Sequence, residues 1–239
     1  MRIALFFVTL LLFSSYFLIA QVKEDIIKKH LTAIGGEKNW QNIKTITSVG
    51  IRTSAGMEVE ETRQIVLNKA LRIDYKFKTR DAALAQKNYF LIINENQGWR
   101  YLPDNIKDSV EALTADEIKY YKAVHFATDP FVKSGQTDLK IEYLNKENIL
   151  NKECYKFSIT AADGQTGYVY LDAVNYLICK RVQISSESES ESDFEDYRMV
   201  GETYTVPFTT DSGYEKYVVK EMQINKPVNE QIFKLSYRK

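Results

Sequence analysis

Few side chains of this sequence have the chemistry of a catalyst. Its 239 residues include two histidines, His30 and His125, and two cysteines, Cys154 and Cys179. A serine or cysteine nucleophile needs a base beside it, but both histidines stand among apolar residues at helical spacing, where a packed ring is expected. A metal site needs three or four converging ligands. The sequence therefore predicts no catalytic residue, no metal site and no cofactor.

Common catalytic and nucleotide-binding motifs are also missing. The sequence has no Gly-x-Ser-x-Gly, no His-Glu-x-x-His, no P-loop and no dinucleotide-binding fingerprint. A pair of carboxylates could hydrolyse a glycosidic bond, yet nothing distinguishes two of the 32 acidic residues from the others. A hydrolase is accordingly the least favoured hypothesis. Because 32 basic residues bring the net charge to 0, no nucleic-acid partner is expected.

The two cysteines are expected to be unpaired. Cys154 and Cys179 lie in segments that we assign to a meander of three antiparallel strands. A whole strand would then separate the two thiols, whereas a disulfide needs Cα atoms within about 7 Å of each other.

The first twenty residues predict export. An apolar run from Ile3 to Ile19 follows Arg2 and ends at Ala20, which is typical of a secretory signal peptide. No cysteine follows the expected cleavage site to receive a lipid. We therefore expect a signal peptide over residues 1–20 and one domain over residues 21–239, located in the periplasm without a lipid anchor. An uncleaved segment would instead tether the domain to the membrane.

Two helices are predicted from apolar spacing and from their end signals. The first follows the signal peptide and stops at Gly35-Gly36. The second begins at Thr114, because Thr114 and Glu117 form a capping box, and Asp129-Pro130 ends its segment.

Most of the remaining chain alternates between apolar and polar residues, as strands do. Residues 71–78 are the clearest case, and 89–93 are apolar at five consecutive positions, so that strand should be covered on both faces. The predicted fold is mainly β (α+β): a single curled antiparallel sheet forming a half-open β-barrel of about nine to eleven strands. The N-terminal helix and the inserted helix would cover its concave apolar face. The Ser/Glu tract at residues 185–192 should form a solvated hairpin tip, with divalent-ion binding as the alternative.

Apolar side chains on the concave face are the candidate binding residues. The predicted cavity lining is Ile73, Tyr75, Phe77, Leu91, Ile93, Trp99, Tyr155, Phe157 and Ile159, and the predicted lid residues are Ile118, Tyr121 and Val124. If the helices cap this face without filling it, the hollow has the size and polarity for acyl chains. An ordinary packed core would give the same alternation, so both interpretations stay open.

Several short segments occur in the order and spacing of one family. They are Ala33-Ile34-Gly35-Gly36 with Ile43-Lys44-Thr45, Gln97-Gly98-Trp99, Asp129-Pro130-Phe131, Tyr197-Arg198-Met199-Val200-Gly201 with Val206-Pro207-Phe208, and Ile224-Asn225-Lys226-Pro227-Val228-Asn229 with Ile232-Phe233. Together they make residues 21–239 resemble the periplasmic lipoprotein-carrier (LolA/LolB-like) superfamily, and within it the branch similar to outer-membrane lipoprotein-sorting proteins.

The resemblance implies a monomeric, non-enzymatic carrier that holds acyl chains of lipids or lipidated proteins under a helical lid. It also implies transient contact with membrane-bound donor or acceptor proteins. Carriers of this kind latch the lid with an arginine on an early strand, for which Arg52, Arg63 and Arg72 are candidates. The alternative function is an envelope interaction module of the same fold that binds a protein or glycan partner through tyrosines and sheet edges.

Overall fold

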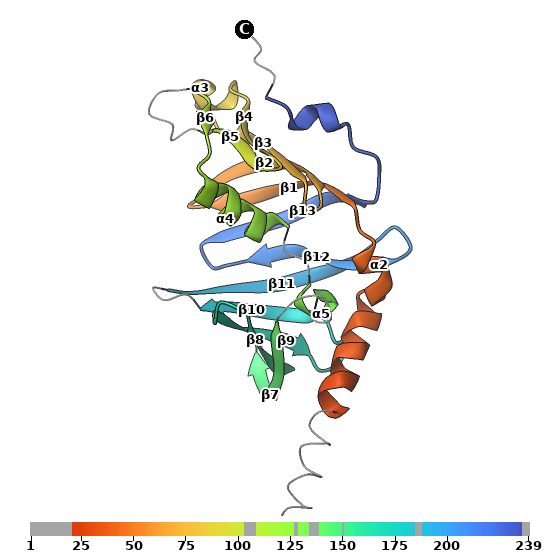
Figure 1. The fold of residues 1–239 in the computed structure, drawn as a ribbon. Coiled ribbons are helices and arrows are strands. Elements are labelled where there is room, and N and C mark those ends of the chain that lie inside the picture. The colour runs from red at the N-terminus through yellow and green to blue at the C-terminus, as the bar shows by residue number, and fades with distance from the viewer. Residues whose placement is uncertain are drawn as a thin grey trace, which may run out of the picture. The chain divides into compact units, whose positions relative to one another are not determined.

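The computed structural model describes residues 21–102, 109–126, 129–133, 139–149, 151–184 and 188–235 (Figure 1). The expected signal peptide, residues 1–20, lies outside the described residues. Within the described ranges, no helix combines the length and the apolar character needed to cross a membrane.

The described strands form one antiparallel sheet. Their bounds are β1 Thr45–Ser54, β2 Met57–Val66, β3 Ala70–Lys78, β4 Tyr89–Asn94, β5 Gln97–Tyr101, β6 Glu111–Ala112, β7 Lys140–Ile149, β8 Lys152–Thr160, β9 Thr166–Asp172, β10 Ile178–Ile184, β11 Glu189–Val200, β12 Tyr204–Asp211 and β13 Glu215–Ile224. They are hydrogen-bonded in the order β6-β5-β4-β3-β2-β1-β13-β12-β11-β10-β9-β8-β7. The predicted mainly β class with an open antiparallel sheet is confirmed. The thirteen strands exceed the predicted nine to eleven, partly because β6 has only two residues and carries no alternation signal.

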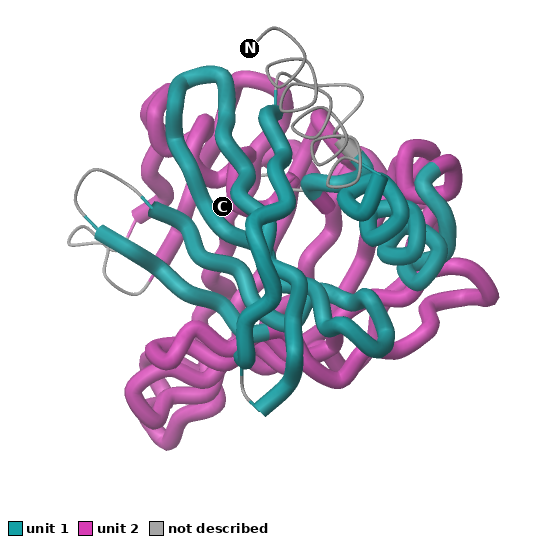
Figure 2. Tube along the Cα trace, turned by 90° about the horizontal axis from the view of Figure 1, so that it is seen from below, with its two compact units in different colours: residues 1–37, 130–193 teal, residues 38–129, 194–239 magenta. Residues whose placement is uncertain are grey.

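Helices are few and short. They are a helix over residues 21–33, α2 Glu37–Gln41, α3 Ala82–Ala85, α4 Ala115–His125, α5 Pro130–Lys133 and the 3-10 helix η1 Glu230–Phe233. Both predicted helices are present, and the first ends before Gly35-Gly36 as expected. The chain divides into two compact units, one formed by residues 1–37 and 130–193 and the other by residues 38–129 and 194–239 (Figure 2). We call them unit 1 and unit 2.

In unit 1, the helix over residues 21–33 is fixed by a buried histidine. His30 is completely buried, and its Nδ1–H donates to the carbonyl oxygen of Tyr176 over 2.7 Å. The ring meets Phe131 edge-on at 5.0 Å between centroids, and Phe131 meets Phe157 in the same way at 5.2 Å. The predicted packed histidine bonded to the backbone is therefore confirmed at His30.

The expected separation of the two cysteines in unit 1 is wrong. Strand β9 does lie between β8 and β10, but the Sγ atoms of Cys154 and Cys179 are 3.0 Å apart, and both thiols are free. The β9–β10 register shifts between Ile178 and Lys180, and Cys154 lies opposite Asp172, the last residue of β9. At this irregular strand end the two side chains reach each other. Burial raises the pKa of both thiols.

The prediction for the Ser/Glu tract at residues 185–192 is also partly corrected. Residues 185–187 lie outside the described residues, but Glu189 to Ser192 open β11 and pair with residues 181–184 of β10. A solvated hairpin tip is therefore wrong for this part of the tract. Strand pairing uses backbone groups, and the Ser and Glu side chains of an exposed strand can remain in water while it forms.

In unit 2, β4 is covered on both faces, as its apolar run predicted. Leu91 and Ile93 pack toward α4. Ile92 points to the opposite face, where η1 packs onto β3 and β4, and is itself buried. This second cover, η1, was not predicted from the sequence.

Candidate functional site

Helix α4 covers one face of the sheet in unit 2. Its start is fixed by the predicted capping box, in which the Thr114 hydroxyl accepts from the Glu117 amide and the Glu117 carboxylate accepts from the Thr114 amide at 2.8 Å. The same carboxylate accepts from Arg100 on β5 at 2.8 Å. Ile118 is the buried residue of the helix, whereas Tyr120 and Val124 are 63% and 51% exposed. The helix thus rests on the sheet through a small contact.

A glycine on β5 permits the close approach of this helix. A Cβ atom at Gly98 would lie 2.7 Å from Cδ1 of Leu113 and 3.2 Å from Cγ1 of Ile118. Both separations are tighter than ordinary carbon contacts of 3.5–4.0 Å. The absence of a side chain at position 98 is therefore part of how α4 is seated.

Three of the predicted cavity residues meet under α4. Ile73, Leu91 and Ile93 belong to one packed cluster that also contains Ile65, Leu71, Leu113, Ile118 and Phe126, with Tyr75 and Tyr121 packed against its edge. Ile73, Leu91 and Ile93 are each at most 1% exposed. In this state the apolar face of unit 2 is packed against its helix. We call this face, with its cluster, the α4 face.

The other predicted residues lie outside this cluster. Phe77 is half-buried and meets Tyr89 edge-on at 5.3 Å. Trp99 pairs with Ile92 in the β4–β5 register, which places it on the face opposite to α4. Tyr155, Phe157 and Ile159 are on β8 in unit 1, and the predicted lid residue Val124 is exposed. The predicted lining residues therefore do not form a single cluster.

A buried charged network adjoins the α4 face, and its central residue was not predicted from the sequence. Glu61 on β2 is completely buried. Its carboxylate accepts from Nε and Nη2 of Arg63, at 2.9 and 2.6 Å, and from Nε and Nη2 of Arg52. Arg52 also donates to Glu215. The network could have been predicted from the alternation of the strand, which puts Glu61 and Arg63 on one face.

Aromatic and polar rings surround this network. The Arg63 guanidinium lies 3.9 Å from the centroid of the Tyr217 ring, which occupies the space left by Gly50. Burial raises the pKa of Tyr75, and the nearby Glu61 carboxylate raises it further. Burial, assisted by the charge of Arg63, lowers the pKa of His125 at the end of α4 to about 4. Near neutral pH, Tyr75 is therefore a protonated donor and His125 an uncharged ring.

The register separates the three arginines considered as lid latches. Arg63 pairs with Ile73 and so shares the α4 face, and Arg52 joins the same network through Glu61. Arg72 is on the opposite face, where it donates to both carboxylate oxygens of Asp74 and to the carbonyl oxygen of Ile232 at 2.9 Å. Arg72 therefore holds η1 and cannot latch α4 in this arrangement.

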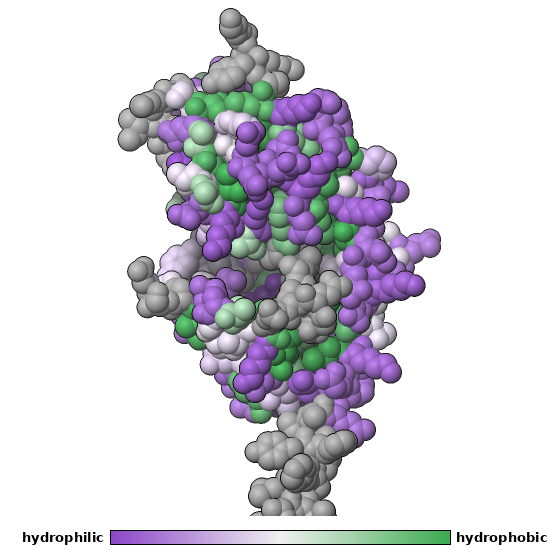
Figure 3. All heavy atoms as spheres, in the orientation of Figure 1, coloured by the Kyte–Doolittle hydropathy of each residue, from purple (hydrophilic) through white to green (hydrophobic). Residues whose placement is uncertain are grey.

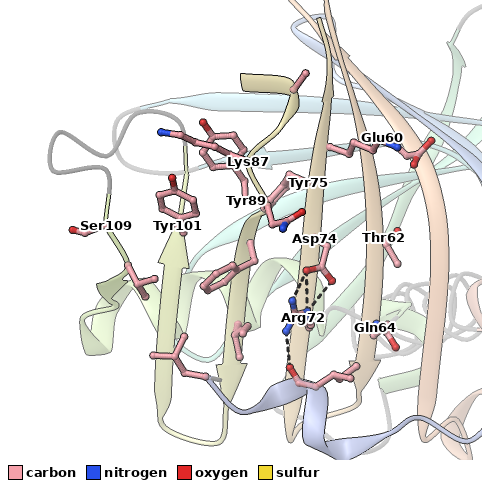
Figure 4. Close-up of a pocket in the computed structure, with 18 of the residues that line it drawn as sticks. Glu60, Thr62, Gln64, Arg72, Asp74, Tyr75, Lys87, Tyr89, Tyr101 and Ser109 are labelled. Atoms are coloured by element: carbon pink, nitrogen blue, oxygen red, sulfur yellow. Dashed lines mark hydrogen bonds and ion pairs between the residues drawn. The ribbon is translucent and has the colours of Figure 1, made fainter. Parts of the chain in front are cut away.

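A groove lies on the face opposite to α4 (Figure 4). Its volume is about 1210 Å³. Polar side chains from β2 and β3, including Thr62, Gln64 and Asp74, lie beside the aromatic rings of Phe90 and Tyr101. A groove with this lining suits a partly polar ligand or partner better than a bare acyl chain.

The face seen in Figure 3 has hydrophobic patches interrupted by hydrophilic residues. The visible described surface therefore has no single continuous apolar area. The apolar residues of the α4 face are instead beneath the helix.

Sequence comparisons give no match to a family model and no match to a curated protein. Comparison of structures does find relatives. An outer membrane lipoprotein-sorting protein domain from Vibrio parahaemolyticus superposes with a TM-score of 0.52 at 13% identity, covering 87% of this chain and 94% of that one. This chain has the fold of that domain.

Two further structures are similar to this chain. A DUF1329 family protein from Desulfovibrio piger has a TM-score of 0.54 at 11% identity, with 89% of this chain and 97% of that chain covered. A LolA superfamily protein from Nitrosomonas europaea has a TM-score of 0.49 at 13% identity, with coverages of 88% and 96%. The predicted structural resemblance is confirmed at the level of the fold.

Proposed function

We propose that this protein is an exported, non-enzymatic carrier that binds acyl chains of lipids or lipidated proteins on the α4 face. The observation that carries the proposal is the apolar cluster around Ile73, Leu91 and Ile93, which α4 covers with one buried side chain, Ile118, while Leu113 and Phe126 flank the helix. Displacement of α4 would open an apolar surface without disturbing the strand pairing of the sheet.

The energies of closing and of ligand binding are comparable. Burying a large apolar side chain stabilises a protein by roughly 1.5–3 kcal/mol, and three of them, Leu113, Ile118 and Phe126, join α4 and its flanks to the cluster. Eight methylene groups of an acyl chain contribute about 6 kcal/mol at roughly 0.8 kcal/mol each. An acyl chain could therefore replace the helix at little net cost.

The shared fold supports this proposal, because the Vibrio relative is described as a lipoprotein-sorting domain. Export through a signal peptide at residues 1–20 and residence of residues 21–239 in the periplasm belong to the same proposal. So does transient contact with membrane-bound donor and acceptor proteins, since a carrier must load and unload its cargo.

A reducible disulfide between α4 and β5, which we call the staple, tests the proposal. In a C154A/C179A background, Gly98→Cys and Ile118→Cys place two thiols where the Gly98 Cβ position and the Ile118 side chain are 3.2 Å apart. We expect the oxidised protein to lose uptake of the neutral fluorescent probe N-phenyl-1-naphthylamine and of palmitate. Reduction of the same sample should restore both.

The comparison of oxidised with reduced protein controls for the altered packing at position 98, because the sequence is the same in both states. The C154A/C179A protein should bind the probe regardless of redox state. If oxidised and reduced stapled proteins bound equally, α4 displacement would be excluded. If the parent protein bound no amphiphile at all, the carrier function itself would fail.

The groove opposite α4 favours a second candidate function. An envelope interaction module could bind a protein or glycan partner among its polar and aromatic side chains. Substituting Tyr101 and Gln64 by alanine, on β5 and β2, should then weaken capture of such a partner while leaving amphiphile uptake unchanged. The reverse pattern would favour the carrier.

A further inference from the structure

The charged network beside the α4 face pairs two partly buried arginines with one fully buried and one more exposed carboxylate. The side chains of Arg52 and Arg63 are 26% and 18% exposed, whereas that of Glu61 is 1% exposed. The second acidic partner, Glu215, is 44% exposed and bonds to Arg52 alone. Two guanidinium groups therefore share one fully buried carboxylate.

Arg63 has a donor that the network does not use. Its Nε and Nη2 both donate to Oε2 of Glu61, and the stacked Tyr217 ring fixes the plane of the guanidinium. Nη1, the third nitrogen of the guanidinium, makes no hydrogen bond to any of the described residues. Nη1 is also not buried, so water or a ligand can reach it.

This donor stands at the end of an apolar row. In the registers of β2, β3 and β4, Arg63 lies opposite Ile73, and Ile73 lies opposite Leu91. Neighbouring strands are about 4.8 Å apart, so the row extends roughly 10 Å across the sheet. Tyr75, whose hydroxyl stays protonated, is the next residue of β3 on the same face. A cationic end and an apolar run match the two parts of an ionised amphiphile.

We infer that the ligand of the α4 face is an anionic amphiphile, whose carboxylate or phosphate binds Arg63 while its acyl chain lies over Ile73 and Leu91. This inference rests on the proposed carrier function and specifies its substrate class. A guanidinium binds carboxylate and phosphate by the same charge-assisted hydrogen bonds. The headgroup would accept from Nη1 of Arg63, the donor that Glu61 leaves unused.

Matched pairs of charged and uncharged ligands test the inference. Displacement of N-phenyl-1-naphthylamine would be measured with palmitate against methyl palmitate, and with lysophosphatidylglycerol against lysophosphatidylcholine. We expect the wild type to bind the anionic member of at least one pair about ten- to a hundredfold more tightly, as one charged hydrogen bond allows. The pair that discriminates identifies the headgroup as carboxylate or phosphate.

Variants assign that preference to Arg63. Arg63→Gln should reduce the preference to less than about threefold, because an uncharged side chain cannot distinguish palmitate from methyl palmitate by charge. Because this change leaves Glu61 with one arginine, the E61Q/R63Q double variant provides a version with balanced charge. Thermal unfolding checks both variants. The matched control is Arg72→Gln, which removes an arginine of the same sheet from the opposite face and should keep the preference.

Three outcomes would overturn the inference. Equal affinity for charged and uncharged ligands would leave the carrier function standing and exclude an anionic substrate. A preference that survives both Arg63 variants would place the headgroup elsewhere. Failure to bind any of the four amphiphiles would remove both the carrier function and the inference drawn from it.

Discussion

Two helices pack on the sheet in different ways. One is the helix over residues 21–33 in unit 1, and the other is α4 in unit 2. The first buries Ile26, Ile27 and His30, and His30 adds a hydrogen bond to the Tyr176 carbonyl. Helix α4 buries Ile118 and relies on an exposed capping box and an ion pair to Arg100. The first helix is thus part of its core, whereas α4 has fewer buried contacts, as the removable cover of the proposed carrier would need.

The largest expected effect is in unit 1. Phe131→Ala removes the ring that His30 and Phe157 contact and should lower the free energy of unfolding by about 3–5 kcal/mol. Urea denaturation followed by circular dichroism measures this loss. Tyr120→Ala, at a largely exposed position on α4, serves as control and should change it by less than about 0.5 kcal/mol. Equal losses would contradict the distinction between the two helices.

A smaller global effect is expected from the buried residue of α4. Ile118→Ala should cost about 2 kcal/mol, the low end for such a truncation, because the helix can detach while the sheet remains folded. Hydrogen exchange should accelerate in residues 115–125 and stay unchanged in residues 21–33. Acceleration across unit 2 as a whole would mean that α4 is an integral element.

The capping box of α4 should contribute still less to the stability of the protein. Thr114→Ala removes the hydroxyl that accepts from the Glu117 amide and should destabilise the helix by about 1 kcal/mol. Thr114→Asp, which retains a capping oxygen, is the matched variant and should restore slow exchange. If both variants exchanged alike, the capping box would have no part in holding the cover.

Lowering the pH should have the smallest effect on the stability of α4, because His125, the group that titrates, is only partly buried. Its pKa is lowered from 6.5 to about 4 in the closed state, mainly by burial and then by Arg63. An open or unfolded state therefore binds more protons between these values, and stability present above pH 6.5 is lost as the pH falls toward 4. Arg52 also opposes protonation, while Glu61 favours it and Tyr121 stacks on the ring.

Hydrogen exchange of residues 115–125 at pH 7 and pH 5, corrected for the intrinsic rate, measures this dependence. His125→Gln should remove it without changing exchange in residues 21–33. A dependence that persists in this variant would have to come from another group.

Local patterns predicted most of the fold. Alternation in residues 71–78, the apolar run at 89–93 and the Thr114/Glu117 capping box each depend on neighbours in sequence, and each is present in the structure. The contact of Cys154 with Cys179 depends on a register shift, and the cover over Ile92 comes from residues far along the chain. Such long-range features leave no periodic signal.

The candidate site was less predictable for the same reason. Ile73, Leu91 and Ile93 were predicted to share one apolar face, and they are buried together because burial follows from the pattern of apolar residues. Trp99 was assigned to the wrong face, since a single aromatic residue after Gly98 does not reveal the phase of its strand. Glu61 was overlooked because its burial depends on two arginines, one of them nine residues away.

The position of Gly98 has a consequence for how such a protein could be tuned. The fit of α4 is set by a missing methyl group on the sheet, where a Cβ atom would press on Leu113 and Ile118. Replacing this glycine by alanine or serine would change the opening equilibrium while leaving the helix, its cap and its charges intact. In the proposed carrier, the residue at position 98 would therefore set how readily α4 opens, independently of the residues that bind the cargo.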